Sequence, residues 1–336
     1  MLANELQSRL EPWLLKVSDA DSVTIIDMAK LSGGAIQENW SLSAAFSSGP
    51  MAGMQKLVVR TDAPASVSVS HSRANEFSIL RLAFDAGVKV PEPLWCCDDQ
   101  NVLGLPFFVM RRIAGTAAGH KLTKDSGLGV DLLQSLAHEL SLIHTIKPAH
   151  DVLTFLPVPE VNTALRDIEQ YQKYLDEFNA PHPILEWGLS WLERNIPDGK
   201  ELVLTHQDFR TGNYMVDDGQ LTGILDWEFG AWGDPMSDIG WFCAKCWRFG
   251  ANHKEAGGIG DREDFYKFYE SQSGRNVDTD AVVYWEVMAH VRWAIVAIQQ
   301  GNRFMVEGEQ NLEAALTAHV VPELELEIMG MTGEAK

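Results

Sequence analysis

The stretch LTHQDFRTGNYMVDDGQLTGILDWEFGAWGDPMSDIGW, residues 204–241, decides the fold of this 336-residue chain. It alternates short apolar runs with glycines, and it carries a histidine, an asparagine and several carboxylates. A soluble core has little use for so many ionisable groups, because each buried charge needs a partner. We therefore expect a functional site in this stretch, and a metal ion together with a phosphate would account for its residues.

Two short strands around an acidic turn form the middle of this stretch. YMV and TGIL flank the sequence DDG, whose Asp217 and Asp218 are typical turn residues and are not site candidates. Such a hairpin brings Asn213, ahead of the first strand, close to Asp226, at the end of the second. A small number of oxygen ligands favours Mg²⁺, which completes its coordination with water and substrate phosphates. Asp208 lies outside this pair and can take a proton from a hydroxyl, which is the chemistry of a kinase.

With these residues in place, the stretch resembles the aminoglycoside phosphotransferase family, a branch of the protein-kinase-like fold. The family pattern joins a His-x-Asp loop, an asparagine, a short hairpin, an acidic pair around a tryptophan, and Gly-Asp-Pro ahead of a further aspartate, and this sequence has each element. The roles that the resemblance implies are Asp208 as catalytic base, Asn213 and Asp226 as Mg²⁺ ligands, Glu228 as a ligand of a second ion, Asp238 as a brace of the catalytic loop, and His206 as a structural residue.

The resemblance extends to the residues ahead of this stretch, which would hold the nucleotide. LSGGAIQENWSLSA looks like the turn that covers the phosphates, because Gly33 and Gly34 let backbone N–H groups approach without a side-chain clash. LPFFVMRRIAG, which contains Met110, looks like the hinge strand that receives the adenine. The resemblance therefore assigns these three residues to nucleotide binding.

A basic residue ends the strand KLVVR. Arg60 stands where many kinases have a lysine, and a guanidinium can also bind phosphate. By the same resemblance, Glu76 is the helix carboxylate that holds Arg60 in place. Lys56, at the start of KLVVR, remains an alternative phosphate ligand.

The order of the predicted elements divides the chain into two lobes. VTIIDMAKL, LSAAF and QKLVVR predict an antiparallel sheet. An amphipathic helix follows it, with its apolar positions at Phe77, Leu80, Leu82 and Phe84. Further along, long helical segments dominate, among them residues 130–146 and 161–178. We therefore predict an α+β, bilobal, protein-kinase-like fold. The nucleotide-binding lobe would cover residues 1–112, and the helical catalytic and acceptor-binding lobe residues 113–336.

Composition argues against several classes of partner. The 27 lysines and arginines against 47 aspartates and glutamates give a formal charge of −20, which disfavours nucleic acid and an anionic membrane surface. The N-terminus lacks the pattern of a signal peptide, and no later segment is an uncharged apolar run long enough to span a bilayer. We therefore expect a cytoplasmic protein with reduced thiols and a small-molecule partner. No pattern in the sequence indicates an oligomeric state.

Several other motifs are better explained by packing than by chemistry. Cys243 and Cys246 form a CxxC in helical, aromatic surroundings, and His138 and His144 lie on one predicted helix at a spacing that allows one face but lacks a third ligand. GGIGD at residues 257–261 lacks the rest of a dinucleotide-binding pattern and indicates a surface loop. The remaining motif is a set of tryptophans that either fill a core, which we favour, or line a pocket for an aromatic or acyl acceptor: Trp241, Trp247, Trp285 and Trp293.

These residues predict a small-molecule phosphotransferase that uses ATP or GTP with Mg²⁺ and transfers the γ-phosphoryl group to a hydroxyl. A second hypothesis is a pseudokinase-like module that binds ATP without turnover, because Arg60 stands where lysine is common. A third hypothesis, an acetyltransferase or hydrolase acting on a CoA ester, finds no nucleophile elbow or catalytic Cys-His pair in the sequence. The acceptor itself stays open, since a fold does not fix a substrate.

Overall fold

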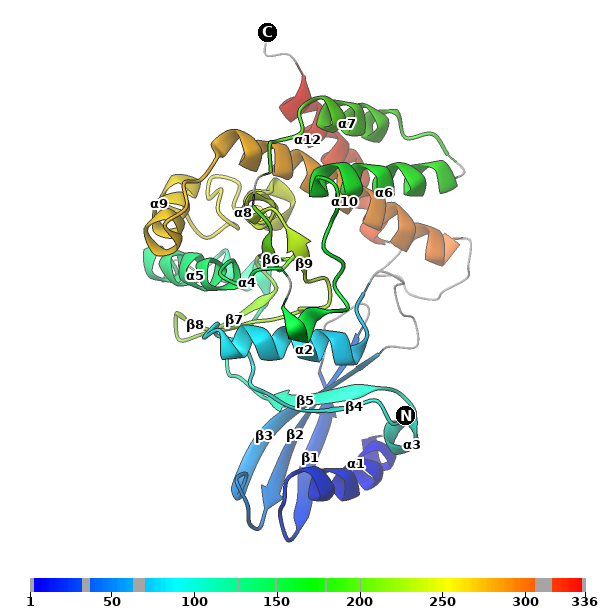
Figure 1. The fold of residues 1–336 in the computed structure, drawn as a ribbon, viewed down its shortest axis with the longest axis vertical. Coiled ribbons are helices and arrows are strands. Elements are labelled where there is room, and N and C mark those ends of the chain that lie inside the picture. The colour runs from blue at the N-terminus through cyan, green and yellow to red at the C-terminus, as the bar shows by residue number, and fades with distance from the viewer. Residues whose placement is uncertain are drawn as a thin grey trace.

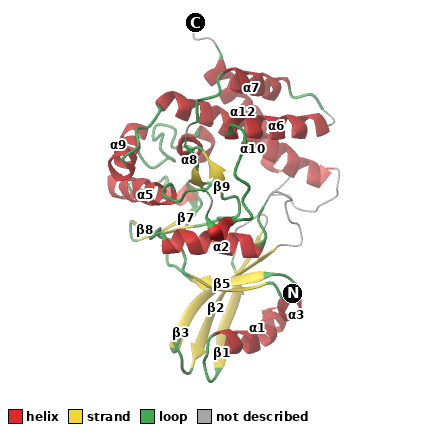
Figure 2. Cartoon of the chain, in the orientation of Figure 1, coloured by secondary structure: helices red, strands yellow, loops and turns green. Residues whose placement is uncertain are grey.

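The computed structural model describes residues 3–31, 37–62, 70–125, 127–148, 150–178, 180–199, 201–305 and 316–333. Within these ranges the chain forms two lobes, with an antiparallel sheet at one end and a group of helices at the other (Figure 1). Figure 2 shows that the long strands gather in one lobe, whereas the other lobe is mainly helical. The predicted sheet-rich front and helix-rich back are therefore both present.

The sheet of the first lobe has the strand order β1-β2-β3-β5-β4, and every neighbouring pair is antiparallel. Helix α1 packs on it through Leu6, Leu10 and Leu14, which recur every four residues and so share one helix face. This helix is absent from the predicted elements. The elements of the lobe are α1 (Ala3–Val17), β1 (Val23–Lys30), β2 (Gln37–Phe46), β3 (Gly53–Asp62), β4 (Pro93–Cys97), α3 (Gln100–Leu103) and β5 (Phe107–Arg111).

Helix α2 (Arg73–Asp85) lies between the sheet and the helical lobe (Figure 1). The predicted helix is present, but the prediction of its apolar face was wrong in part. Its buried face centres on Ile79 and Ala83, whereas Leu82 and Phe84 are only partly buried. Ile79 and Ala83 belong to the hydrophobic core of the helical lobe, so α2 joins the two lobes by packing. The division of the chain after residue 112 stays a prediction.

The second lobe is built around α10, the longest described helix, against which α7, α8 and α12 pack. Helix α5 packs against α9, and the predicted helical segments 130–146 and 161–178 correspond to α5 and α6. The elements of this lobe are α4 (Gly119–Leu122), α5 (Val130–Ile143), α6 (Thr163–Glu177), α7 (Pro183–Arg194), β6 (Val203–Thr205), β7 (Tyr214–Asp217), β8 (Gln220–Ile224), β9 (Ala231–Gly233), α8 (Pro235–Cys243), α9 (Arg262–Ser273), α10 (Thr279–Met305) and α12 (Val321–Thr332), with 3-10 turns at Asp151–Leu153, Lys245–Trp247 and Ala318–Val320.

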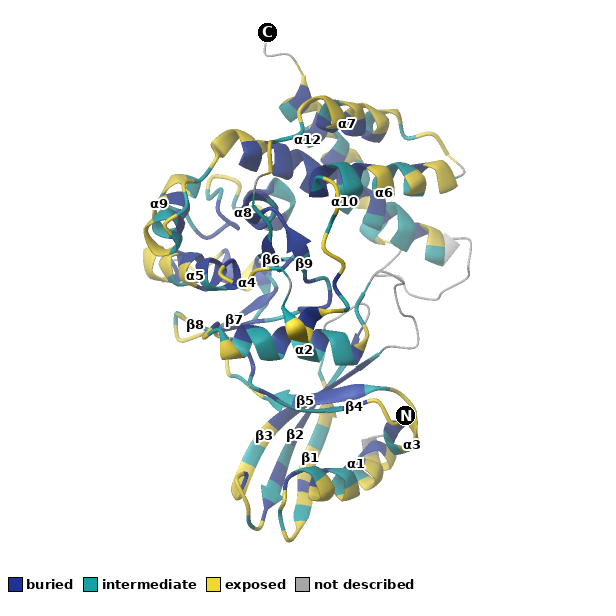
Figure 3. Ribbon diagram, in the orientation of Figure 1, coloured by how far each residue is buried: buried dark blue, intermediate teal, exposed yellow. Residues whose placement is uncertain are grey.

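Helix α10 is the one helix among the described residues that has the length and hydropathy of a membrane span. Its Thr279–Arg303 segment contains a window of mean hydropathy 1.4, but 72% of that window is buried inside the protein. Glu286 interrupts the apolar run and pairs with Arg262 of α9 at 2.6 Å. Figure 3 shows the buried residues of the lobe gathered around β6, β9 and α8, beside α10. In this structure α10 is therefore a core helix.

Close packing between α8 and α10 makes one glycine indispensable. A Cβ atom added at Gly240 would lie 2.5 Å from Trp285 Cβ on α10, a separation that real Cβ atoms essentially never show. We expect Gly240→Ala to destabilise the fold by about 1–3 kcal/mol, the usual cost of overpacking a core. The denaturant midpoint of unfolding measures this loss.

Gly330 on α12 provides the matched control for that substitution. A Cβ atom there meets nothing within 4 Å, and alanine favours a helix over glycine by up to about 1 kcal/mol. We therefore expect Gly330→Ala to leave the denaturant midpoint unchanged or to raise it. Equal midpoints for the two variants would contradict the packing described between α8 and α10.

Candidate active site

A buried carboxylate on α8 holds the loop that follows β6. Asp238 Oδ2 accepts a hydrogen bond from the His206 backbone N–H at 2.7 Å, and Oδ1 accepts one from the Gln207 N–H at 2.9 Å. Gln207 has a φ of 65°, a conformation that costs energy for a residue other than glycine. Since Asp238 binds the N–H group of this strained residue and that of the residue before it, it fixes the course of the loop.

His144 supports the same carboxylate from α5. Its Nε2 lies 3.2 Å from Asp238 Oδ2, and its Nδ1 lies 2.7 Å from the Tyr269 hydroxyl. Burial lowers the pKa of His144, although Asp238 opposes this shift, so the ring is held neutral. A neutral ring that donates from Nε2 accepts at Nδ1, which matches both partners. The histidine that the sequence indicates as a packing residue therefore also orients the loop.

His206 connects the loop to the end of the hairpin. Its Nδ1 accepts the Asp208 backbone N–H at 3.2 Å, which assigns the proton to Nε2. Nε2 then donates to the Leu225 carbonyl oxygen at 2.8 Å, one residue before Asp226. The ring also packs against Trp227, with the ring centroids 4.7 Å apart. One neutral imidazole thus ties the backbones beside two candidate site residues together.

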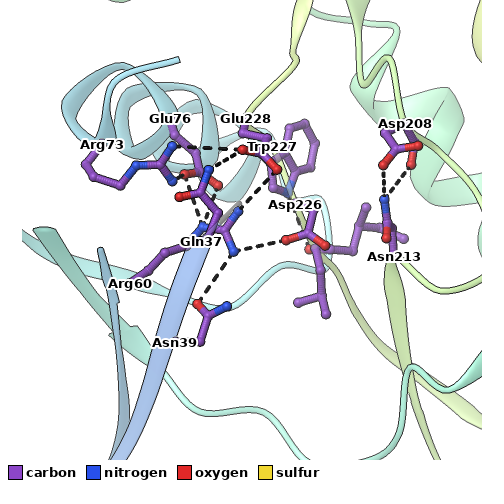
Figure 4. Close-up of polar contacts among 12 residues, drawn as sticks. Gln37, Asn39, Arg60, Arg73, Glu76, Asp208, Asn213, Asp226, Trp227 and Glu228 are labelled. Atoms are coloured by element: carbon purple, nitrogen blue, oxygen red, sulfur yellow. Dashed lines mark hydrogen bonds and ion pairs between the residues drawn. The ribbon is translucent and has the colours of Figure 1, made fainter. Parts of the chain in front are cut away.

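The hairpin predicted from the sequence is formed by β7 and β8. Tyr214 pairs with Ile224, and the Leu225 N–H donates to the Asn213 carbonyl oxygen at 2.8 Å. Asn213 and Asp226 therefore lie at the same end of the hairpin, as Figure 4 shows. Asp226 has a φ of 61°, so its backbone adopts the left-handed conformation at this point.

The carboxylate of Asp208 is surrounded by hydrogen-bond donors. Its Oδ1 accepts from Arg210 Nε at 3.0 Å and from Trp241 Nε1 at 2.9 Å, and Oδ2 accepts from Asn213 Nδ2. Asn213 Nδ2 also donates to the Asp208 backbone oxygen at 3.0 Å. The side chain is 13% exposed, so solvent or a small ligand can still reach it. The arrangement fixes the orientation of a partly accessible carboxylate.

Two buried arginines join the sheet, α2 and the end of the hairpin. Arg60 Nε lies 2.9 Å from Glu76 Oε1, and Arg60 Nη1 lies 3.0 Å from Asp226 Oδ1 (Figure 4). Arg73 pairs with Glu76 as well, and its Nε lies 2.9 Å from Asp62 Oδ1. Burial alone would lower the pKa of Arg60, but the carboxylates, Glu76 first, raise it above its ordinary value. Arg60 is therefore charged at any physiological pH.

Glu228 completes this cluster from the helical lobe. Its carboxylate is buried and accepts a hydrogen bond from Gln37 Nε2 on β2, and its Oε1 lies 3.9 Å from Arg60 Nη2. Its backbone oxygen accepts from the His71 N–H at 2.9 Å. Burial raises the pKa of Glu228 to about 7, Arg60 lowers it, and Glu76 raises it further. This residue therefore links the lobes through side chain and backbone alike.

Comparisons with known proteins identify the family to which this arrangement belongs. Residues 28–270 match the model of the phosphotransferase enzyme family. The chain belongs to this family. It is 19% identical to a putative aminoglycoside phosphotransferase from Ralstonia eutropha JMP134, with a TM-score of 0.75 and 98% of each chain covered. It is 14% identical to a spectinomycin phosphotransferase solved with ADP and spectinomycin, with a TM-score of 0.62 and 98% of each chain covered.

A longer protein is also similar to this phosphotransferase family member. Acyl-CoA dehydrogenase family member 11 of Rattus norvegicus is 26% identical over 293 residues, which cover 81% of this chain and 37% of the rat protein. The chain thus spans little more than a third of the length of that relative. The family match and the solved structures confirm the predicted family and the kinase-like fold, and they support a small-molecule phosphotransferase.

Most of the predicted site residues of this phosphotransferase fall into two adjoining groups. Figure 4 shows Asp226 between the pair of Asp208 and Asn213 on one side and the arginine cluster on the other. The predicted partners Arg60 and Glu76 are in contact. The first group, around the catalytic loop, contains His206, Asp208, Asn213 and Asp238, and the second contains Arg60, Glu76, Asp226 and Glu228.

The remaining predicted nucleotide residues lie elsewhere. Gly33 and Gly34 are outside the described residues. Met110 is half-buried on β5 opposite Val58 of β3, and its assignment to the adenine stays a prediction. Lys56 is exposed on β3, about 13 Å along the strand from Arg60, so it lies outside this cluster, and its role as an alternative phosphate ligand stays a prediction.

Several residues of the site were not predicted from the sequence. Arg73 stands three residues before Glu76 on α2, a spacing that could have indicated an ion pair. No local signal indicates Gln37, whose partner Glu228 is distant in the sequence, whereas Arg210 stands only two residues after its partner Asp208. The GGIGD segment was wrongly expected at the surface: Gly257 is buried, and its carbonyl oxygen accepts from Thr211 Oγ1 of the catalytic loop at 2.6 Å.

The few oxygen ligands of the site would suit a magnesium ion, which keeps part of its water shell, better than an ion that is held entirely by protein ligands. In the part of the chain that the structure describes, no group of three or more His, Cys, Asp or Glu side chains is arranged to hold a metal ion. Asn213 uses its amide N–H group on Asp208, which leaves its amide oxygen for a cation beside Asp226. Among the described residues, four carboxylates face the two guanidinium groups of Arg60 and Arg73: Asp62, Glu76, Asp226 and Glu228. Because the pKa of Glu228 is raised to about 7, this cluster keeps between one and two unbalanced negative charges near neutral pH. The excess charge favours a cation, and Mg²⁺ needs few protein ligands.

The dependence of the catalytic loop on Asp238 can be tested by Asp238→Asn. An amide in place of the carboxylate sets its NH₂ group against one of the two backbone N–H donors. Buried hydrogen bonds to a charged acceptor contribute about 1.5–3 kcal/mol each, so we expect a loss of about 3 kcal/mol in the free energy of unfolding. Asp217→Asn at the exposed hairpin turn is the control and should change it by less than about 0.5 kcal/mol. Similar values for both variants in urea unfolding would contradict the assigned brace.

Proposed function

We propose that the chain is a Mg²⁺-dependent phosphotransferase that moves the γ-phosphoryl group of ATP or GTP to a hydroxyl of a small acceptor. The observation that carries this proposal is the position of Asp226. Its carboxylate lies between the buried pair of Arg60 and Glu76 and the oriented carboxylate of Asp208 (Figure 4). A phosphate held by Arg60 and a hydroxyl facing Asp208 would therefore meet beside a cation ligand.

Arg60 supports the phosphate part of this proposal. Its Nη2 group is buried and makes no hydrogen bond within the described part of the chain, although Glu228 lies at ion-pair distance. An unsatisfied buried guanidinium N–H is costly unless a ligand satisfies it, and phosphate oxygens accept such bonds well. Glu76 and Arg73 keep the guanidinium in place from α2. Arg60 can thus take the part that lysine takes in many kinases.

Asp208 supports the proton-transfer part. Donors on three sides hold its carboxylate, and its partial exposure leaves room for a hydroxyl. A positioned carboxylate of this kind contributes by accepting or orienting the hydroxyl proton during in-line attack. Asn213 and Asp226 would hold Mg²⁺, which, when bound, neutralises charge on the transferred phosphoryl group.

We propose that the acceptor approaches Asp208 from the side of Gln207, where a small cavity lies between α6, α8 and α10. Its volume of about 20 Å³ is that of about one water molecule, so the cavity itself does not hold the acceptor. Gln207, adjacent to Asp208 in the chain, lines it together with Asp167 and Arg292. Trp241 and Trp285 also line it, so these two tryptophans are both buried and close to a cavity.

The competing hypothesis is a module that binds nucleotide without turnover. The only observation that favours this hypothesis is arginine at the position where many kinases have lysine. Arg60 nevertheless contacts Glu76, the helix carboxylate that holds the basic residue in place in a kinase. The complete set of Asp208, Asn213 and Asp226 favours the enzyme. The names of the longer relatives, which refer to acyl-CoA dehydrogenases, do not change this choice, since the matched part is only a fraction of those proteins.

The role of Asp208 is tested by Asp208→Ala. We expect Mg²⁺-dependent nucleotide turnover, screened with a library of small hydroxyl and amine compounds, to fall by about 10²–10⁴-fold, the usual contribution of a positioned base. Calorimetry should give a Kd for Mg-ATP or Mg-GTP close to that of the unchanged protein. Wild-type turnover by the variant would refute the assignment, and nucleotide binding without any turnover in either protein would favour the binding module.

Asp226→Ala tests the proposed metal ligand separately. We expect nucleotide affinity measured with Mg²⁺ to weaken by about tenfold or more, because one of few protein ligands is lost. Affinity measured with EDTA should change little, or even improve, since the same substitution removes a negative charge. Asp218→Ala, at the exposed hairpin turn, is the matched control. An equal effect of Asp226→Ala with and without Mg²⁺ would show that Asp226 does not act through the metal.

A further inference from the structure

We infer that Trp241 is a positioning residue for the base, an inference that rests on the proposed role of Asp208. Trp241 lies on α8, and its indole Nε1–H donates to Asp208 Oδ1 at 2.9 Å. The side chain is 7% exposed, so this hydrogen bond is shielded from water. The sequence indicates Trp241 as a core residue, and the structure shows that its polar atom is directed at the candidate catalytic carboxylate.

The hydrogen bond of Trp241 decides which oxygen of Asp208 can take a proton. A carboxylate offers about four lone-pair positions, two on each oxygen. On Oδ1, Trp241 and Arg210 occupy both, whereas on Oδ2 only the Asn213 amide is bound. The remaining position is on Oδ2, on the side of Asn213. Trp241 thereby directs the acceptor hydroxyl toward the oxygen that lies next to the proposed metal ligand.

The indole itself is held from several sides. The guanidinium of Arg292 on α10 lies 4.5 Å from the Trp241 ring centroid, and its Nη1 donates to the Gln207 carbonyl oxygen at 2.7 Å. A cation over an aromatic face withdraws electron density and so strengthens the ring N–H as a donor. The Trp247 ring centroid lies 5.2 Å from that of Trp241. The indole therefore cannot turn away from Asp208 without disturbing a buried cluster.

Trp247 offers a control within the same cluster, because phenylalanine would keep an aromatic face under Arg210, whose guanidinium lies 4.4 Å from the Trp247 ring centroid. It is as buried as Trp241, but its Nε1 atom makes no hydrogen bond within the described residues. Replacing either tryptophan by phenylalanine keeps an aromatic ring and removes the indole N–H group. A purely structural role would make the two substitutions similar in effect, whereas a positioning role makes Trp241→Phe the damaging one.

The experiment compares Trp241→Phe, Trp247→Phe and Asp208→Ala in the full chain, with Mg-ATP turnover as the readout. We expect Trp241→Phe to lower kcat by about ten- to a hundredfold, the effect of one lost hydrogen bond to a charged group. Its Kd for Mg-ATP should stay within about twofold, since the nucleotide side of the site is untouched. Trp247→Phe should keep kcat within about threefold. Equal kcat values for the two phenylalanine variants would overturn the inference.

Asp208→Ala separates failure of this inference from failure of the proposed function. If Asp208→Ala retains turnover, the proposed base is wrong, and the role of Trp241 falls with it. If Asp208→Ala loses turnover while Trp241→Phe keeps it, only the inference about Trp241 is overturned.

Indole NMR gives a readout that needs no turnover. With ¹⁵N-labelled tryptophan, Asp208→Ala should shift the Trp241 indole N–H resonance, because its acceptor is removed. The Trp247 resonance should shift less, because its Nε1 has no hydrogen-bond partner among the described residues, although Arg210 lies over its ring. The two phenylalanine variants assign the resonances. An unshifted Trp241 resonance would also overturn the inference.

Discussion

The candidate active site depends on one buried carboxylate, that of Asp238. It lies in the first turn of α8, which Asp234 caps and Pro235 begins, so the unpaired N–H groups of the helix start favour a negative charge there. From this position Asp238 accepts the N–H groups of His206 and Gln207. These bonds satisfy the carboxylate in the interior and, by the same geometry, hold a strained loop backbone.

Further contacts of the site follow from that loop geometry. Once His206 is fixed, its ring can bind the Asp208 N–H on one side and the Leu225 carbonyl oxygen on the other. Because the hairpin sets Asn213 beside Leu225, the loop and the two strands become one rigid unit. A catalytic group needs this kind of support, since a small displacement costs much of the advantage of a positioned base.

The sequence predicted those parts of the site whose signals are local. Turn residues and strand-forming runs indicate the β7–β8 hairpin, and the helix start after Gly-Asp-Pro places Asp238 in the first turn of α8. Contacts between distant segments gave no such signal. Gln37 meets Glu228 across the lobes, and Arg73 belongs to the cluster because α2 packs into the helical core. A helical pattern predicts which side of the helix a residue lies on, but not which distant residue its side chain contacts. The hydrogen bond from Trp241 to Asp208 was therefore not predicted either.

The net charge of −20 says little about the site, because the local balance of charges decides what binds there. In this structure Arg60 divides its guanidinium between Glu76 and Asp226. Under the proposed function, a cation at Asp226 would compete with Arg60 for that carboxylate. Glu76 would still hold the guanidinium through Nε, and Nη2 has no hydrogen-bond partner among the described residues. Arg60 could therefore exchange a carboxylate for a phosphate without leaving its place on the sheet, so metal and nucleotide would bind more strongly together than either alone.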